Sequence, residues 1–208
     1  MIRTAVLASV AALSLSACGA PEPATAPGEP ASPGAQAPQT PSTTPTPAPA
    51  NVLTSEGLGE MRIGMTLAEL TAVAGPDANP GQVGGAEPAV CDEFHPARAP
   101  EGVNVMIQDG RLARITLIRQ SAIKTDRGVG LGDTAAAVRQ AYGAALIAQP
   151  HKYAPAPAED LFAWSRGGSN AYVQDPNARG IRYEINAEGR VQMIHAGAPA
   201  IQLVEGCF

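Results

Sequence analysis

Charged residues are scarce in this chain. Only 16% of its 208 residues are Asp, Glu, Lys or Arg, whereas globular chains average about 25%. The formal net charge is -5. A mildly acidic chain gains no counterion release from a polyanion, so this charge balance excludes a nucleic-acid partner.

Long hydrophobic runs and familiar catalytic motifs are also missing. Outside the N-terminus no stretch of 18 apolar residues occurs, which excludes an internal membrane span. The sequence holds no G-x-S-x-G, S-x-x-K, H-E-x-x-H or P-loop motif. The glycines at 128, 130 and 132 lack the strand, turn and long helix of a dinucleotide site. We therefore expect no cofactor.

The first 17 residues have the layout of an export signal. Arg3 supplies a positive start, and Ala5–Leu15 is a run of small and aliphatic residues. The sequence LSAC at residues 15–18 resembles the bacterial lipobox, in which the cysteine is lipidated and becomes the mature N-terminus. The resemblance implies that residues 1–17 are removed and that Cys18 carries lipid. The alternative is an ordinary signal peptide cut after the small residues 18–20.

Lipid on Cys18 would fix where the protein resides. Bacterial lipoproteins carry three acyl chains on this cysteine, and each buried CH2 adds about 0.8 kcal/mol of membrane affinity. Gly19, rather than Asp, follows the cysteine, and in such lipoproteins this favours the outer membrane. The expected partner of Cys18 is therefore the membrane, with the rest of the chain in the periplasm.

A Pro- and Ala-rich tether is expected over residues 18–50. Ten of the twenty prolines lie in this segment, and Pro21–Ala50 contains no Leu, Ile, Val, Met or aromatic residue. Such a segment cannot bury enough apolar area to offset the cost of ordering its backbone. At about 3.1 Å per residue in polyproline II, it could hold a domain up to roughly 90 Å from the lipid.

Residues 51–208 form the expected domain, which contains two similar halves. Residues 63–75 align with residues 131–143, with Gly, Thr, Ala, an aliphatic residue and Gly recurring. Further on, Gly-Arg-aliphatic-x-x-Ile occurs at 110–115 and again at 189–194. These matches indicate two degenerate repeats, over about 52–120 and 121–208. The alternative is that two common motifs each occur twice.

Each half begins with a short predicted helix. Thr66 and Glu69 have the spacing of a capping box, and Gly75 followed by Pro76 ends the helix. The second helix is expected from Thr134 to Tyr142, where a glycine follows.

Strands follow each helix in the prediction. Val103–Gln108 and Arg111–Ile118 flank Asp-Gly, the strongest signal for a type I′ hairpin. Four further segments have strand character: Leu161–Ser165, Ala171–Gln174, Ile181–Asn186 and Arg190–His195. The expected fold class is α+β, with two repeats that each pack a short helix on an antiparallel β-meander.

Two segments resemble known envelope proteins. Residues 59–70, GEMRIGMTLAEL, resemble the opening of the fold shared by the β-lactamase inhibitor protein and the small lipoprotein subunit of the outer-membrane barrel-assembly machinery. The tail at residues 205–207, EGC, is similar to that of many envelope lipoproteins. The resemblance implies this fold and the binding of protein partners without chemistry.

Cys91 and Cys207 are the two cysteines that remain once Cys18 is lipidated. In an oxidising compartment the simple expectation is a disulfide between them. A loop of that length would stabilise the fold by about 4 to 5 kcal/mol in the chain-entropy model. A redox or nucleophilic cysteine is the alternative, although no C-x-x-C motif is present.

Two short stretches are candidate sites. Residues 91–95, CDEFH, gather ligand-type side chains, but no second histidine follows at helical spacing, so we expect no metal. His151, Lys152 and Tyr153 combine a cation with an aromatic ring. This trio is a candidate recognition patch, and the alternative is a solvated loop.

The function expected from these features is non-catalytic. The sequence favours a lipid-anchored, periplasm-facing binding or scaffold protein that recognises a protein or an envelope polymer. The alternative is a periplasmic hydrolase that acts on peptidoglycan or a small ester. A deep pocket with two or more titratable groups of shifted pKa would favour the hydrolase, and a flat or shallow concave sheet would favour binding.

Overall fold

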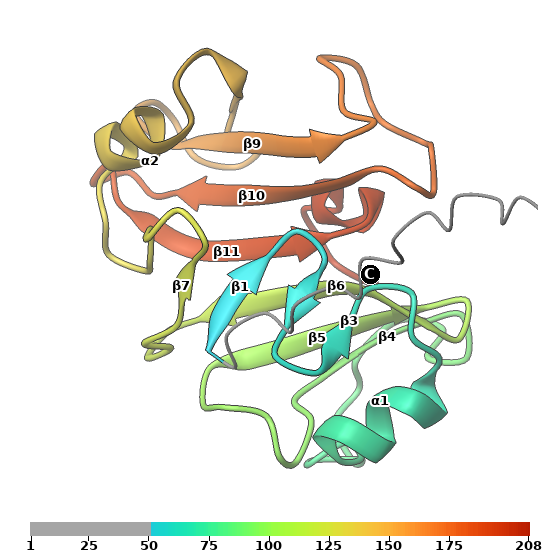
Figure 1. The fold of residues 1–208 in the computed structure, drawn as a ribbon. Coiled ribbons are helices and arrows are strands. Elements are labelled where there is room, and N and C mark those ends of the chain that lie inside the picture. Colours follow the sequence, from blue (N-terminus) through green and yellow to red (C-terminus); the bar gives the residue numbers. More distant parts are fainter. Residues whose placement is uncertain (1–50) are drawn as a thin grey trace, which may run out of the picture. The chain divides into compact units, whose positions relative to one another are not determined.

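The computed structural model describes residues 51–208 as two β-sheets and two short α-helices (Figure 1). The expected signal peptide, the lipidated Cys18 and the tether lie outside the described residues. No helix within residues 51–208 is long and apolar enough to cross a membrane.

The elements follow one another with short connections. Their bounds, in chain order, are β1 Val52–Thr54, β2 Gly57–Leu58, β3 Met61–Arg62, α1 Leu67–Ala74, β4 Cys91–Phe94, β5 Val103–Gln108, β6 Arg111–Ile118, β7 Lys124–Thr125, α2 Ala135–Tyr142, η1 Gly143–Ala145, β8 Leu146–Pro150, β9 Glu159–Arg166, β10 Arg179–Ile185, β11 Val191–Gly197 and η2 Pro199–Gln202. The fold is thus mixed α and β, and its sheets are mostly antiparallel.

The larger sheet has seven strands in the order β4-β5-β6-β11-β10-β9-β8, all paired antiparallel. Its central strand is β11, which pairs with β6 so that Thr116 lies opposite His195. The smaller sheet has the order β3-β2-β1-β7, and its β1–β7 pair is parallel. The large sheet therefore joins the strands that follow α1 to those that follow α2.

Both helices begin and end where the sequence predicts. At α1 the Thr66 hydroxyl accepts from the Glu69 amide at 3.3 Å, and the Thr66 amide donates to the Glu69 carboxylate at 2.8 Å. This capping box satisfies two amides that the first helical turn leaves free. At α2 Thr134 accepts from the Ala137 amide at 3.1 Å, and the helix ends at Gly143.

The hairpin β5–β6 has the predicted bounds and turn. Asp109 and Gly110 have φ values of 50° and 72°, and positive φ at both central residues is what a type I′ turn requires. The prediction of a strand over Ala171–Gln174 is wrong. The backbone of Val173 pairs instead with a side chain, because its amide donates to Gln202 Oε1 and its carbonyl accepts from Gln202 Nε2, both at 2.9 Å.

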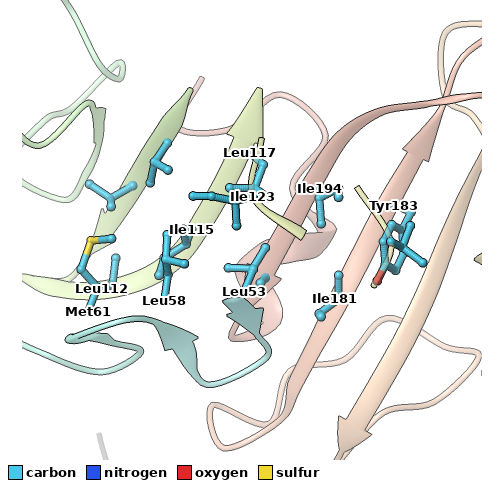
Figure 2. Packing of buried hydrophobic residues seen from close by; sticks show 14 of the residues in the cluster. Leu53, Leu58, Met61, Leu112, Ile115, Leu117, Ile123, Ile181, Tyr183 and Ile194 are labelled. Atoms are coloured by element: carbon cyan, nitrogen blue, oxygen red, sulfur yellow. The ribbon is translucent and has the colours of Figure 1, made fainter. Parts of the chain in front are cut away.

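The core lies between the smaller sheet and one face of the larger sheet (Figure 2). The smaller sheet contributes Leu53, Leu58 and Met61, and the larger sheet contributes Leu112, Ile115, Leu117, Ile181, Tyr183 and Ile194. The buried Leu70 and Val138 attach the two helices to the same cluster. One face of the seven-stranded sheet is therefore committed to hydrophobic packing.

Candidate functional site

The opposite face of the seven-stranded sheet carries charged and polar side chains, because successive side chains of a strand point to opposite faces. Arg114 and Thr116 flank the core residue Ile115 on β6, and His195 follows a core residue on β11. All members of this polar face are buried: Arg114, Thr116, Asp160, Arg182, Glu184 and His195.

The C-terminal segment, residues 199–208, covers part of the polar face. Its short helix η2 contacts β6, β10 and β11. Arg114 Nη1 donates to the carbonyls of Ala200 at 3.1 Å and Leu203 at 2.8 Å. The expected disulfide between Cys91 and Cys207 is present and ties the end of this segment to β4. Covalent and hydrogen bonds therefore hold the C-terminal segment against the polar face.

A pocket of about 240 Å³ lies between the sheet and the C-terminal segment. We call it the polar pocket. Its lining residues are Glu93 on β4, Asn104 and Val105 on β5, Arg114, Thr116 and Ile118 on β6, Glu184 on β10, Met193 and His195 on β11, and Val204, Glu205 and Gly206 of the C-terminal segment.

The charges around the polar pocket are already paired. Arg114 forms an ion pair with Glu93, and Arg182 lies between Asp160, 3.7 Å from Nε, and Glu184, 3.4 Å from Nη2. Burial lowers the pKa of Arg114 to about 10, against the opposing effect of Glu93, so the guanidinium stays charged at neutral pH. The charged side chains around the pocket are therefore engaged with one another.

Thr116, His195 and Glu184 form a chain of polar contacts. The Thr116 hydroxyl lies 3.1 Å from His195 Nδ1, and His195 Nε2 lies 3.6 Å from Glu184 Oε2. Burial and then the charge of Arg182 lower the pKa of His195 to about 3, so the ring is neutral. With its proton on Nε2, facing the carboxylate, Nδ1 accepts a hydrogen bond from Thr116.

Glu184 stays ionised within this chain. Burial by itself would raise the pKa of Glu184, but hydrogen bonding to His195, the nearby positive charge of Arg182 and a hydrogen bond from Gln192 together lower it. Since His195 is neutral, Arg182 is the cation that stabilises the carboxylate. The pocket thus contains one carboxylate that is held charged beside a neutral imidazole.

The candidate patch of His151, Lys152 and Tyr153 lies at the edge of this arrangement. His151 Nδ1 accepts from the amides of Tyr153 and Ala154, at 3.1 and 3.0 Å, and its Nε2 lies 3.4 Å from Glu184. Lys152 pairs with Glu205 of the C-terminal segment at 2.8 Å, and its Nζ lies 4.9 Å from the centre of the Tyr153 ring. Tyr153 is 62% exposed. His151 is therefore half-buried, whereas Lys152 and Tyr153 lie at the surface.

Sequence reasoning missed the polar face itself. The polar face is visible in the sequence as alternating polar and apolar residues, in RITL at 114–117 and RYEI at 182–185. Such alternation usually marks a sheet face that is exposed to solvent. The candidate cluster at residues 91–95 is not brought together, because Cys91 is in the disulfide and His95 Nδ1 contacts the Val103 carbonyl at 2.7 Å. Within residues 51–208, no group of three or more His, Cys, Asp and Glu side chains could hold a metal.

No protein-family model matches the chain, and neither a curated protein nor a solved structure matches it. The features that bear on its function are therefore the polar pocket and the residues around it.

Proposed function

We propose that this chain is a lipid-anchored, periplasm-facing binding or scaffold protein that recognises a protein or an envelope polymer without chemistry. The observation that carries the proposal is that the charged side chains of the site are fixed by one another and by the C-terminal segment. The charges of the site are paired with one another, and the disulfide-tied C-terminal segment holds them in place. A site that is rigid before binding loses less conformational entropy when a partner docks.

The binding surface that we propose lies beside the polar pocket, at Lys152 and Tyr153. Lys152 contacts the C-terminal segment and Tyr153 presents an exposed ring. Aromatic side chains are enriched among the residues that dominate binding energies. The candidate patch is thereby reduced to two surface residues, and the half-buried His151 supports them through its contacts with the amides of Tyr153 and Ala154.

Site-specific photo-crosslinking in intact cells tests this proposal. A photoreactive residue at Tyr153 is expected to form an adduct with a protein or with envelope polymer. The matched control is Tyr172, which is 63% exposed against 62% for Tyr153 but lies in the loop between β9 and β10 rather than next to the Lys152–Glu205 ion pair. Adducts at neither position, or equal adducts at both, would contradict a binding surface at Tyr153.

The alternative is a periplasmic hydrolase acting on peptidoglycan or a small ester, and one arrangement favours it. Thr116, His195 and Glu184 follow the order hydroxyl, imidazole, carboxylate of a nucleophilic triad, in a pocket with several shifted pKa values. However, a general base works best when its pKa is near the working pH, and the pKa of His195 is about 3. This weak basicity favours binding over catalysis.

The two functions are separated by an isosteric variant. We expect purified sacculi and p-nitrophenyl esters to be turned over no faster by the wild-type protein than by Thr116→Val. Turnover that disappears in Thr116→Val would establish the hydrolase and overturn the non-catalytic proposal.

The proposal includes an internal duplication, with each repeat a short helix followed by an antiparallel meander. Matching hydrogen bonds support it. Arg111 Nη1 donates to the Gly64 carbonyl at 2.9 Å, and Arg190 Nη1 donates to the Gly132 carbonyl at 2.9 Å. These partners occupy corresponding positions in the two sequence matches, 64 with 132 and 111 with 190.

Two surface hollows give the duplication further support. One, of about 410 Å³, is lined in part by Val73 and Ala74 at the end of α1. The other, of about 210 Å³, is lined in part by Ala141 and Tyr142 at the end of α2. Val73 and Ala141 are 68 positions apart, and so are Ala74 and Tyr142. The matching segments 63–75 and 131–143 have the same offset.

A further inference from the structure

Strand β8 forms one edge of the seven-stranded sheet and, in the described part of the chain, pairs only with β9. Its register places Gln149 opposite Asp160, and just beyond the strand the His151 amide donates to the Ala158 carbonyl at 3.4 Å. Hydrogen-bonded positions alternate along an antiparallel pair, so Gln149 and Ile147 are the residues of β8 whose backbone binds β9. The backbone groups of the residues between and beside them point away from the sheet.

The outward edge of β8 therefore offers three carbonyls and one amide. The carbonyls belong to Leu146, Ala148 and Pro150. The amide is that of Ala148, because proline has no N–H and the Leu146 amide donates to the Gly143 carbonyl. Within residues 51–208, no other strand or loop binds these groups, and Ala148 and Pro150 are exposed. Such an edge can pair with a further extended segment.

The opposite edge of the sheet is closed to such pairing. On β4 the amides of Cys91 and Glu93 donate to the carbonyls of Glu87 at 2.9 Å and Gly84 at 3.0 Å. In addition, β4 carries two acids, Asp92 and Glu93, whereas β8 has no charged residue. Charges on an edge strand deter the addition of another strand, so β8 is the open edge of this sheet.

The hydrogen-bonding groups of β8 decide which occupant fits it. A second copy of this chain is a poor one, because each β8 has one free amide and two copies could form no more than two hydrogen bonds in any register. A segment with an amide at every second position could donate to all three carbonyls and accept from the Ala148 amide. Leu146 and Ile147 are half-buried, and apolar side chains of such a segment would cover them further.

We propose that an extended, uncharged segment of a partner protein adds a strand to the free edge of β8. Main-chain hydrogen bonds give such strand addition its affinity, and the segment has no proline at the alternate positions that face β8. The inference rests on the proposed binding function and specifies a protein as the partner. Lys152 and Tyr153 follow β8 by two and three residues, so the added strand and the exposed Tyr153 ring belong to one binding surface.

Amide hydrogen exchange of the full-length chain in detergent tests whether the edge is free. We expect the Ala148 amide to exchange at least about 100-fold faster than the amides of Ile147 and Gln149, because the latter two bind β9. Protection of Ala148 that increases with protein concentration would mean that two copies pair. Protection at every concentration would mean that residues 18–50 of the same chain cover β8. Either result would overturn the proposal.

A proline variant tests pairing with the partner. Ala148→Pro removes the outward amide without removing a hydrogen bond to β9, and Ala148→Ser is the control that keeps the amide. With the photoreactive residue at Tyr153, we expect Ala148→Pro to lower the yield of protein adduct by about tenfold or more and Ala148→Ser to leave it unchanged. An undiminished adduct in an Ala148→Pro protein with a wild-type circular dichroism spectrum would contradict strand addition.

A charged variant replaces Ala148→Pro if that protein does not fold. Ala148→Lys keeps the amide but adds a charge to an exposed position of the edge, and charged edge strands resist pairing. We expect it to lower the adduct at Tyr153 relative to Ala148→Ser. Equal yields from the two variants would contradict the proposal.

Failure of this inference can be told apart from failure of the proposed function. A Tyr153 adduct that does not depend on Ala148, or that consists of envelope polymer, would disprove strand addition and leave the binding function standing. The absence of any adduct at Tyr153 in the wild-type protein would overturn both.

Discussion

Gly85 lies directly against the Cys91–Cys207 disulfide. A Cβ atom built on Gly85 would be 2.3 Å from the Cys91 carbonyl oxygen and 2.7 Å from Cys207 Cβ. Four residues earlier, a Cβ atom on Gly81 would meet nothing within 4 Å. The two glycines share one loop but differ completely in the space around them.

We therefore expect Gly85→Ala to lower the free energy of unfolding by about 1 to 3 kcal/mol through overpacking. Gly81→Ala is the control and is expected to be neutral or slightly stabilising, because alanine restricts the unfolded chain. Chemical denaturation of both variants measures the difference. Equal midpoints with equal slopes would show that the segment shifts freely away from Cys207.

His195 makes the stability depend on pH. Its pKa is lowered from 6.5 to about 3 in the folded protein, first by burial and then by the charge of Arg182. Between these values the unfolded chain binds the extra proton, so stability is fully present above about pH 6.5 and falls as the pH drops toward 3. His195→Gln removes this titration.

We expect the unfolding free energy of the wild type to fall more steeply between about pH 6.5 and 5 than that of His195→Gln. His95→Gln is the control for removal of a histidine. Denaturation at several pH values gives the slopes. Parallel slopes for the wild type and His195→Gln would mean that the folded state protonates His195 as readily as the unfolded chain.

At the scale of elements, the C-terminal segment depends on two kinds of attachment. The disulfide joins Cys207 to β4, and Arg114 binds the carbonyls of Ala200 and Leu203. Only the disulfide closes a loop of 116 residues in sequence and so restricts the unfolded chain.

The double variant Cys91→Ala/Cys207→Ala should lose about 2 to 5 kcal/mol of stability. The arginine contacts still hold the segment near the sheet, so we expect the variant to fold at low temperature. Denaturation curves measure the loss, and reduction of the wild-type protein should reproduce it. A reduced protein that unfolds at the same midpoint as the oxidised one would show that the closed loop contributes no stability.

At the scale of the whole molecule, the proposed lipid on Cys18 decides where the domain acts. Three acyl chains bind a membrane far more strongly than the single chain that gives only marginal attachment. We expect Cys18→Ser to move the protein from the outer-membrane fraction to the soluble fraction. Fractionation with immunodetection checks this, with Cys91→Ser as the control for loss of a cysteine. A Cys18→Ser protein that still sediments with the outer membrane would contradict the anchor.

The sequence by itself determined the local features of the domain. The Thr66–Glu69 capping box and the Asp-Gly turn at residues 109–110 depend on atoms within a few residues of one another, so short-range preferences were sufficient to predict them. The pairing of Cys91 with Cys207 was predicted by counting, from the expectations that Cys18 carries lipid and that the domain lies in an oxidising compartment.

The candidate site was decided by tertiary structure alone. Thr116 and His195 are 79 residues apart and meet only because β6 pairs with β11 in one register, and a slip of one residue would turn every side chain to the other face. The alternation around Arg114 indicated a polar face but not that the C-terminal segment covers it. Whether a polar face is solvated or buried depends on contacts between distant segments, and residue patterns within one strand carry no information about those contacts.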